Sequence, residues 1–226
     1  MRSSALYKFW VENDYFDAET KKELLSIKDN PKEIEERFYK DLEFGTGGLR
    51  GIIGAGTNRI NIYTVRKASQ GLADYIKSLG LQDRGIAIAY DSRYKSPEFA
   101  LEAAKVFAGN GIKAFLFDEL RPTPELSFTV RHLNAAAGVV ITASHNPKEY
   151  NGYKVYGEDG GQLPVEASNK VISYINKIED ITQVKVMEKD EAIEKGLLRI
   201  IGKEIDDEYI SKLKTLSVNP DLAAEI

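Results

Sequence analysis

Short apolar runs alternate with segments of helical periodicity along most of the chain. The runs have the length and the turn boundaries of buried strands, at residues 85–90, 112–117 and 135–141. Helical segments, in which apolar side chains recur three or four positions apart, are 64–79, 96–108, 124–133 and 165–178. Strands that alternate with helices predict βαβ units, and hence a largely parallel sheet covered by helices on both faces.

The first 40 residues have a different pattern, which predicts three short helices. Leu6, Phe9 and Trp10 fall on one face of a helix, and Pro31 suits the first turn of another. Because these aromatic side chains need burial, we expect the helices to pack on the main domain rather than to form a loose acidic arm.

Composition narrows the class of protein. Of the 226 residues, 42% are hydrophobic, enough for an ordinary core, and no apolar stretch is long enough to cross a membrane. The formal charge of −4 argues against a nucleic-acid binder held by phosphate contacts. The absence of cysteine excludes disulfides and thiolate metal sites, and the first residues lack the apolar core of a signal peptide. We therefore expect a cytoplasmic protein, and its oligomeric state stays open.

Candidate chemistry lies where the apolar run 135–141 ends, at the string TASHNP of residues 142–147. A serine at the carboxyl end of a strand lies where α/β sheets hold their ligands. Ser144 at that position could carry a covalent group such as a phosphate. The plain alternative is an ordinary turn, because serine, histidine, asparagine and proline all favour turns or caps.

Three strings together resemble one family. TASHNP, followed by NGYK at 151–154, is similar to the active-site serine loop of the α-D-phosphohexomutases, the phosphoglucomutase and phosphomannomutase family. FGTGGLRG at 44–51 and YDSR at 90–93 resemble two further family motifs, in the family's order. The resemblance implies a three-layer α/β/α domain with a mixed four-stranded core sheet, preceded here by the N-terminal helices.

The resemblance also implies a reaction. A phosphorylated Ser144 would pass its phosphate to a hexose monophosphate, and the sugar bisphosphate would then return its other phosphate. The strings NGYKVY at 151–156 and EDGGQ at 158–162 look most like the phosphoglucomutase and phosphopentomutase branch. We therefore expect interconversion of glucose 1-phosphate and glucose 6-phosphate, with glucose 1,6-bisphosphate as activator or intermediate. Mannose and pentose phosphates are the alternatives.

Four residues are candidates for catalysis by this resemblance: Ser144, Lys154, His145 and Arg50. The amine of Lys154 would act as proton carrier or countercharge, or would be an ordinary surface lysine. The guanidinium of Arg50 can hold phosphate bidentately after a flexible glycine-rich stretch. His145 either hydrogen-bonds phosphate or substrate oxygens or fixes the loop.

Further candidates for binding the substrate or its phosphate are Thr46, Gly47, Arg93 and Asn146. Each has a structural alternative. A glycine-rich stretch is often only a turn, and Asn146 would shape the serine loop. Arg93 would pair with Asp91 at the end of a strand.

A metal site is incomplete in this sequence. The family uses Mg²⁺, held by the serine phosphate and by three aspartates of an Asp-Gly-Asp-type loop. This chain lacks such a loop, since Asp206 and Asp207 fall in a helical pattern without the glycine. Ser144, through its oxygen or its phosphate, is the single metal ligand that we expect here.

The resemblance divides the chain into three parts. We expect a helical extension at 1–40, the first phosphohexomutase domain at 41–198, and the start of a truncated second domain at 199–226, where a strand (197–201) and a helix (206–216) follow a charged stretch. Such a fragment should be inactive alone. The alternative class is a stand-alone domain that binds sugar phosphates or regulates. An unrelated serine hydrolase lacks a plausible base and the Gly-x-Ser-x-Gly elbow.

Overall fold

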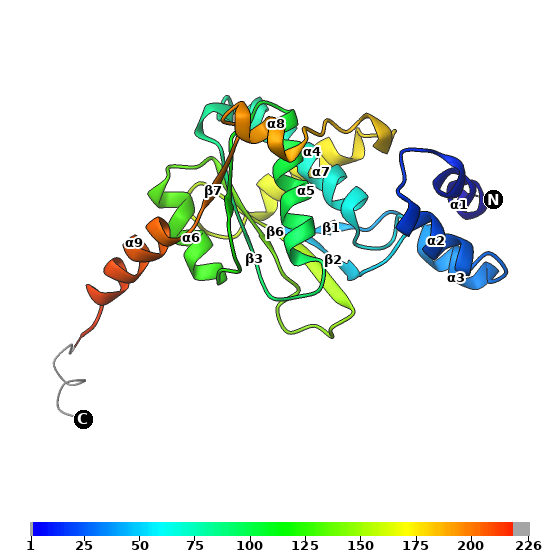
Figure 1. The fold of residues 1–226 in the computed structure, drawn as a ribbon, viewed down its shortest axis with the longest axis horizontal. Helices are drawn as coiled ribbons and strands as arrows, with labels where there is room; N and C mark the ends of the chain where they lie inside the picture. Colours follow the sequence, from blue (N-terminus) through cyan, green and yellow to red (C-terminus); the bar gives the residue numbers. More distant parts are fainter. Residues whose placement is uncertain (1, 219–226) are drawn as a thin grey trace.

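The computed structural model describes residues 2–218, which form a mixed sheet between layers of helices (Figure 1). The strands are β1 Phe44–Gly45, β2 Gly48–Ile52, β3 Ile86–Tyr90, β4 Ala114–Phe117, β5 Ala137–Ile141, β6 Tyr150–Tyr156 and β7 Leu198–Ile201. The α-helices are α1 Arg2–Glu12, α2 Ala18–Ser26, α3 Pro31–Phe38, α4 Ile62–Ser78, α5 Ser96–Gly109, α6 Thr123–His132, α7 Val165–Asn176, α8 Lys189–Glu194 and α9 Lys203–Lys214. Two 3-10 turns are η1 Gln82–Arg84 and η2 Ile181–Gln183.

Within residues 2–218 the sheet has seven strands, in the order β1-β2-β6-β5-β3-β4-β7. Neighbours among β5, β3, β4 and β7 are parallel, whereas β6 runs antiparallel between β5 and β2. The expected mixed α/β fold is confirmed, but the expected number of four strands is wrong. No apolar run marks β1, which has two residues, or the glycine-rich β2. The strand expected at 197–201 is present as β7, but it pairs with β4 in this sheet and was not counted in it.

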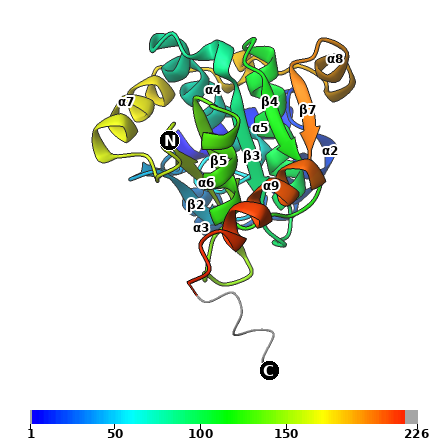
Figure 2. The same cartoon turned by 90° about the vertical axis from the view of Figure 1, so that its left-hand side faces the viewer.

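The two faces of the sheet are buried by different helices. In β3, Ile86 and Ile88 belong to the larger core cluster together with residues of α4, α5 and α7. Ala87 and Ala89 point the other way, into a smaller cluster with residues of α6 and α9. The alternation follows from the two-residue period of a strand, and burial of both faces explains why β3 reads as a continuous apolar run. The view in Figure 2 shows α4 and α9 on different sides of the strands.

The three N-terminal helices are confirmed, and they pack on the first turn of α4. Trp10 stacks on Phe16, with ring centroids 4.3 Å apart, and meets the edge of Tyr63 at 5.4 Å. The Tyr63 hydroxyl donates a hydrogen bond of 2.8 Å to Asp17, the residue that caps α2. Burial and this carboxylate raise the pKa of Tyr63 to about 12. The helices lie beside the β1–β2 end of the sheet (Figure 1).

Among residues 2–218, none of the helices has both the length and the apolar character that crossing a membrane requires.

Candidate functional site

Ser144 lies at the tip of a tight turn that follows β5. Thr142 and Ala143 are still buried, and Ser144 is the first exposed residue of the turn. Its φ of 55° is in the left-handed region, which a residue with a Cβ enters at some cost in energy. The Ser144 amide donates to Thr142 Oγ1 over 2.9 Å. The turn therefore presents the serine hydroxyl to solvent at the carboxyl ends of the parallel strands.

Lys154 reaches Ser144 because of the strand register. In β6, Lys154 is opposite Val140 of β5 on one side and opposite Gly48 of β2 on the other. From this position its Nζ donates a hydrogen bond of 2.7 Å to Ser144 Oγ. The ammonium group of Lys154 is thus in direct hydrogen-bond contact with the serine hydroxyl oxygen.

Arg50 approaches the same turn from β2. Leu49 and Gly51 are buried, so Arg50 points to the exposed side of the strand, and its partner in β6 is Gly152. Gly152 lies two positions from Lys154, which puts Arg50 and Lys154 on one face of the sheet. Arg50 Nη1 donates a hydrogen bond of 2.9 Å to Asn146 Oδ1. The serine loop is thereby joined to a strand that is distant in the sequence.

Two glycines allow these strands to approach so closely. A Cβ at Gly48, where φ is +155°, would lie 2.0 Å from the carbonyl oxygen of Tyr153. A Cβ at Gly152 would lie 2.5 Å from the carbonyl oxygen of Thr142. Because a side chain at either position would clash with neighbouring backbone, the two glycines allow β2, β5 and β6 to pack closely beneath the site.

Thr46 and Gly47 form the turn between β1 and β2. With φ of +83°, Gly47 suits this turn, and its amide donates to Ser168 Oγ over 3.1 Å. The Thr46 carbonyl accepts a hydrogen bond of 3.3 Å from Gln162. Both residues line a cavity of about 660 Å³ together with Arg50 and Lys154.

The remaining candidates surround the serine. Ser144, Arg93 and Asn146 line a second hollow of about 690 Å³. Lys154 and Arg50 line the first cavity and bond to residues of the second, so they connect the two. His145 is exposed beside Ser144 and has no hydrogen bond or ion pair with another residue of the described chain.

Comparison with known proteins identifies the family. The family model described as phosphoglucomutase/phosphomannomutase, alpha/beta/alpha domain I, matches residues 41–182. The chain belongs to the phosphoglucomutase/phosphomannomutase family. The resemblance inferred from the three sequence strings is therefore confirmed.

Relatives in this family are longer than the chain. It is similar to the phosphoglucomutases of Staphylococcus saprophyticus, with 39% identity over 214 residues, and Staphylococcus epidermidis, with 42% over 185. These alignments cover 92% and 82% of the chain, but only 37% and 34% of the relatives. A crystal structure from Thermus thermophilus, named as a phosphomannomutase, superimposes with a TM-score of 0.64 at 27% identity, over 78% of this chain and 36% of that one.

Some residues that share the site were not expected from the sequence. Tyr39 and Lys40, which follow α3, and Arg59 line the same cavity as Arg50 and Lys154. They belong to no motif, and only the fold brings the end of the N-terminal helices to this side of the sheet. Gln162 also lines the cavity, and its position at the end of the EDGGQ string is the one signal that the sequence offered.

The described residues do not fit a complete metal site of this family. No group of three or more His, Cys, Asp or Glu side chains in residues 2–218 is arranged to hold a metal ion. Asp91 and Glu149 line the same hollow as Ser144, but with it they do not make up the set of three carboxylates that the family site would need.

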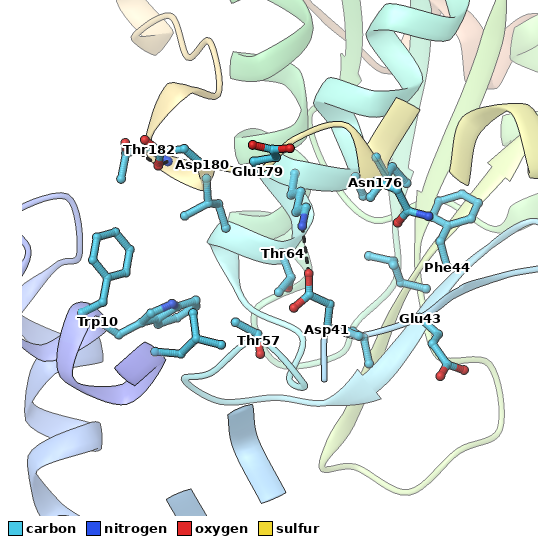
Figure 3. A pocket seen from close by; sticks show the side chains of 18 of the residues that line it. Trp10, Asp41, Glu43, Phe44, Thr57, Thr64, Asn176, Glu179, Asp180 and Thr182 are labelled. Carbon is cyan, nitrogen blue, oxygen red and sulfur yellow. Dashed lines mark hydrogen bonds and ion pairs between the residues drawn. The ribbon is translucent and has the colours of Figure 1, made fainter. Parts of the chain in front are cut away.

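A separate cavity of about 550 Å³ lies between α1, the β1–β2 hairpin, α4 and the segment after α7. Trp10 and Thr182 are at one end of it, and Phe44 and Asn176 are at the other (Figure 3). None of the catalytic candidates lines this cavity.

Proposed function

We propose that the chain is the serine-bearing first domain of a phosphoglucomutase that interconverts glucose 1-phosphate and glucose 6-phosphate. The observation that carries this proposal is the hydrogen bond of 2.7 Å from Lys154 Nζ to Ser144 Oγ. An exposed serine oxygen that accepts a hydrogen bond from an ammonium group is suited to reversible transfer of a phosphoryl group. The positive charge of the ammonium group compensates the negative charge of the phosphoryl group. Membership of the family supports the same reaction.

The transfer would proceed in two balanced steps. The free hydroxyl oxygen of the hexose monophosphate attacks the phosphorus of phosphorylated Ser144. A bond from phosphorus to the sugar oxygen forms, the bond to Ser144 Oγ breaks, and one proton moves in effect from the sugar hydroxyl to the serine oxygen. The resulting bisphosphate, glucose 1,6-bisphosphate, then returns its other phosphoryl group to Ser144 by the reverse exchange.

Each neighbouring side chain has a proposed part. Lys154 stabilises the negative charge that develops on Ser144 Oγ. Arg50, held by Asn146, is placed to bind phosphoryl oxygens through its remaining N–H groups. His145 offers a further hydrogen bond from the tip of the loop. Thr46 and Gly47 form the wall of the cavity that would receive the sugar phosphate.

Residues 2–218 would provide only part of a magnesium site. Ser144, or its phosphate, would supply one metal ligand, and the other ligands would come from elsewhere in a longer protein. The expected division into 41–198 and 199–226 would cut β7, which pairs with β4 in the sheet, so we propose that the first domain extends through β7 and that the second starts after it. The chain alone should therefore bind poorly and not turn over, and glucose, mannose or pentose specificity would be set in the other domains.

Turnover assays test the proposal. This chain, the full-length protein and its Ser144→Ala variant are compared for conversion of glucose 1-phosphate, mannose 1-phosphate and ribose 1-phosphate. We expect activity in the full-length protein, with glucose 1-phosphate preferred, and none in the variant or in this chain. Substantial turnover by this chain would refute the fragment proposal. A native reading frame no longer than 226 residues, with sugar-phosphate binding but no turnover, would favour the stand-alone binding domain.

A further inference from the structure

We infer that Arg93 is a positioning residue that holds the serine loop in place and does not bind the substrate phosphate. The inference rests on the proposed role of Ser144 as phosphoryl carrier. Arg93 belongs to the YDSR string that follows β3, and the serine loop follows β5. The partners of its guanidinium group and the register of the sheet both support this role.

Four of the five N–H groups of this guanidinium donate hydrogen bonds to backbone carbonyls. Nη1 donates to the carbonyl oxygens of Pro147 at 2.9 Å and Tyr150 at 3.0 Å. Nη2 donates to those of Ser144 at 2.8 Å and Asn146 at 2.6 Å. Nε lies 3.6 Å from Asp91 Oδ2. Because a guanidinium has five N–H donors, four of them are used on backbone carbonyls and the fifth, on Nε, faces the Asp91 carboxylate, so the guanidinium has no pair of free donors for a phosphate.

The serine loop needs such a partner. Between the end of β5 at Ile141 and the start of β6 at Tyr150 the backbone forms no strand or helix. Carbonyl groups in such a segment require hydrogen bonds from elsewhere, and three of them, together with the Tyr150 carbonyl at the start of β6, converge on Arg93. One of these carbonyls belongs to Ser144, whose left-handed φ of 55° is stable only when its surroundings fix it.

The register of the sheet places Arg93 beside Ser144. Tyr90, the last residue of β3, pairs with Ile141, the last residue of the parallel strand β5. Arg93 and Ser144 each lie three residues beyond this pair, so both turns leave the sheet side by side. The Asp91 amide also donates to the Ile141 carbonyl over 3.1 Å, which extends the pairing into the turns.

A second set of hydrogen bonds fixes Arg93 and the base of the loop to each other. Asp91 Oδ1 accepts from the Arg93 amide at 3.0 Å and from Ser96 Oγ at 2.8 Å. The buried side chain of Asn151 donates to Ser96 Oγ at 3.0 Å and to the Tyr94 carbonyl at 3.1 Å. Asn151 lies in β6, the strand of Lys154. The YDSR turn thereby connects both ends of the loop that carries Ser144.

The test replaces Arg93 by glutamine or alanine in the full-length protein. We expect kcat to fall on the order of 100-fold, as for a misplaced reacting group, while KM changes little. Guanidinium ion added to Arg93→Ala should restore part of kcat. Amide hydrogen exchange of residues 142–150 should increase in both variants, which reports loosening of the loop independently of activity.

Arg84→Gln is the matched control. Arg84 likewise donates to backbone carbonyls, those of Asn134 and Ala135, but at the opposite end of β5. We expect this variant to leave kcat and exchange in 142–150 unchanged.

The outcomes separate the alternatives. A rise in KM with kcat unchanged would overturn the inference and would indicate that Arg93 binds the substrate phosphate. Unchanged amide exchange in residues 142–150 would also overturn it, because the loop would then not depend on Arg93. If the unsubstituted protein has no mutase activity, the proposed function fails. The exchange measurement then still decides whether Arg93 holds the loop.

Discussion

Lys154 Nζ lies 2.7 Å from Ser144 Oγ, and the pairing of β5 with β6 sets this distance. The loop between these strands reverses the chain direction, so that Lys154, ten positions after Ser144 in the sequence, lies beside it in the structure. Lys154 lines one of the two hollows of the site and Ser144 lines the other. In the proposed reaction, the charge that develops on the serine oxygen is compensated at this point.

Replacing Lys154 by methionine should therefore reduce phosphoryl transfer without unfolding the protein. Removal of one aligned donor from a developing oxyanion costs roughly 100- to 1000-fold in kcat. The half-buried side chain of Lys154 makes no other side-chain hydrogen bond in the described part of the chain, so the thermal midpoint should hardly change. Steady-state kinetics of the full-length protein measure the effect.

Lys170→Met, on the exposed side of α7, is the control. An equal loss of kcat in both variants would contradict the role of Lys154.

Gly48→Ala should strongly destabilise the domain. The added Cβ would lie 2.0 Å from the Tyr153 carbonyl oxygen, at a position with φ of +155°. We expect a loss of about 3 kcal/mol or more in the free energy of unfolding, measured by urea denaturation.

The control for this substitution is Gly80→Ala. Gly80 follows α4 with φ of +70°, and a Cβ there would meet no atom within 4 Å. Only the backbone strain of about 1 kcal/mol should appear. Similar losses in both variants would show that the contact of β2 with β6 is not as close as described.

Glu125 should make stability depend on pH. The residue is only 5% exposed, and its Oε1 has no hydrogen-bond partner in the described residues. Burial, together with a hydrogen bond to Asp206 and the charge of that carboxylate, raises the pKa of Glu125 from 4.5 to about 7. Arg121, which binds Asp206 at 2.6 and 2.8 Å, opposes this shift and holds the pKa of Asp206 low.

The folded chain then binds the Glu125 proton more tightly than the unfolded chain does. Stability should fall as pH rises from about 4.5 to about 7 and should stay level above that range. Glu125→Gln keeps a donor for Asp206 and removes the charge, so its unfolding free energy should exceed that of the native protein at about pH 8 and match it near pH 4.5. Glu194→Gln, exposed at the end of α8, serves as the control. A constant difference between Glu125→Gln and the native protein across this pH range would contradict the assignment.

The position of Ser144 could be predicted from the sequence because the apolar run of β5 ends just before it. The apolar runs and helical periodicities before and after this strand likewise predicted the βαβ units. The length of the sheet could not be predicted, because β1 and β2 take their order from pairing with β6. A glycine-rich hairpin offers no apolar alternation of its own.

The partners of Arg93 are also beyond the reach of sequence patterns. Its hydrogen bonds go to carbonyl groups, which every residue possesses, so no choice of side chain in the loop marks them. Tyr39 and Lys40 reach the cavity only through the packing of the N-terminal helices on Tyr63. Sequence strings thus indicate which residues are candidates for the chemistry, whereas the fold decides which residues hold them in place.

The central claim is that Ser144 carries the phosphoryl group, and peptide mass spectrometry tests it most directly. The full-length protein is incubated with glucose 1,6-bisphosphate, digested, and the peptide containing residues 142–150 is fragmented to locate any added phosphate. We expect a phosphate on Ser144 that disappears from the protein after incubation with excess glucose 1-phosphate. An unmodified Ser144 in a catalytically active protein, or a phosphate on a different residue, would contradict this claim.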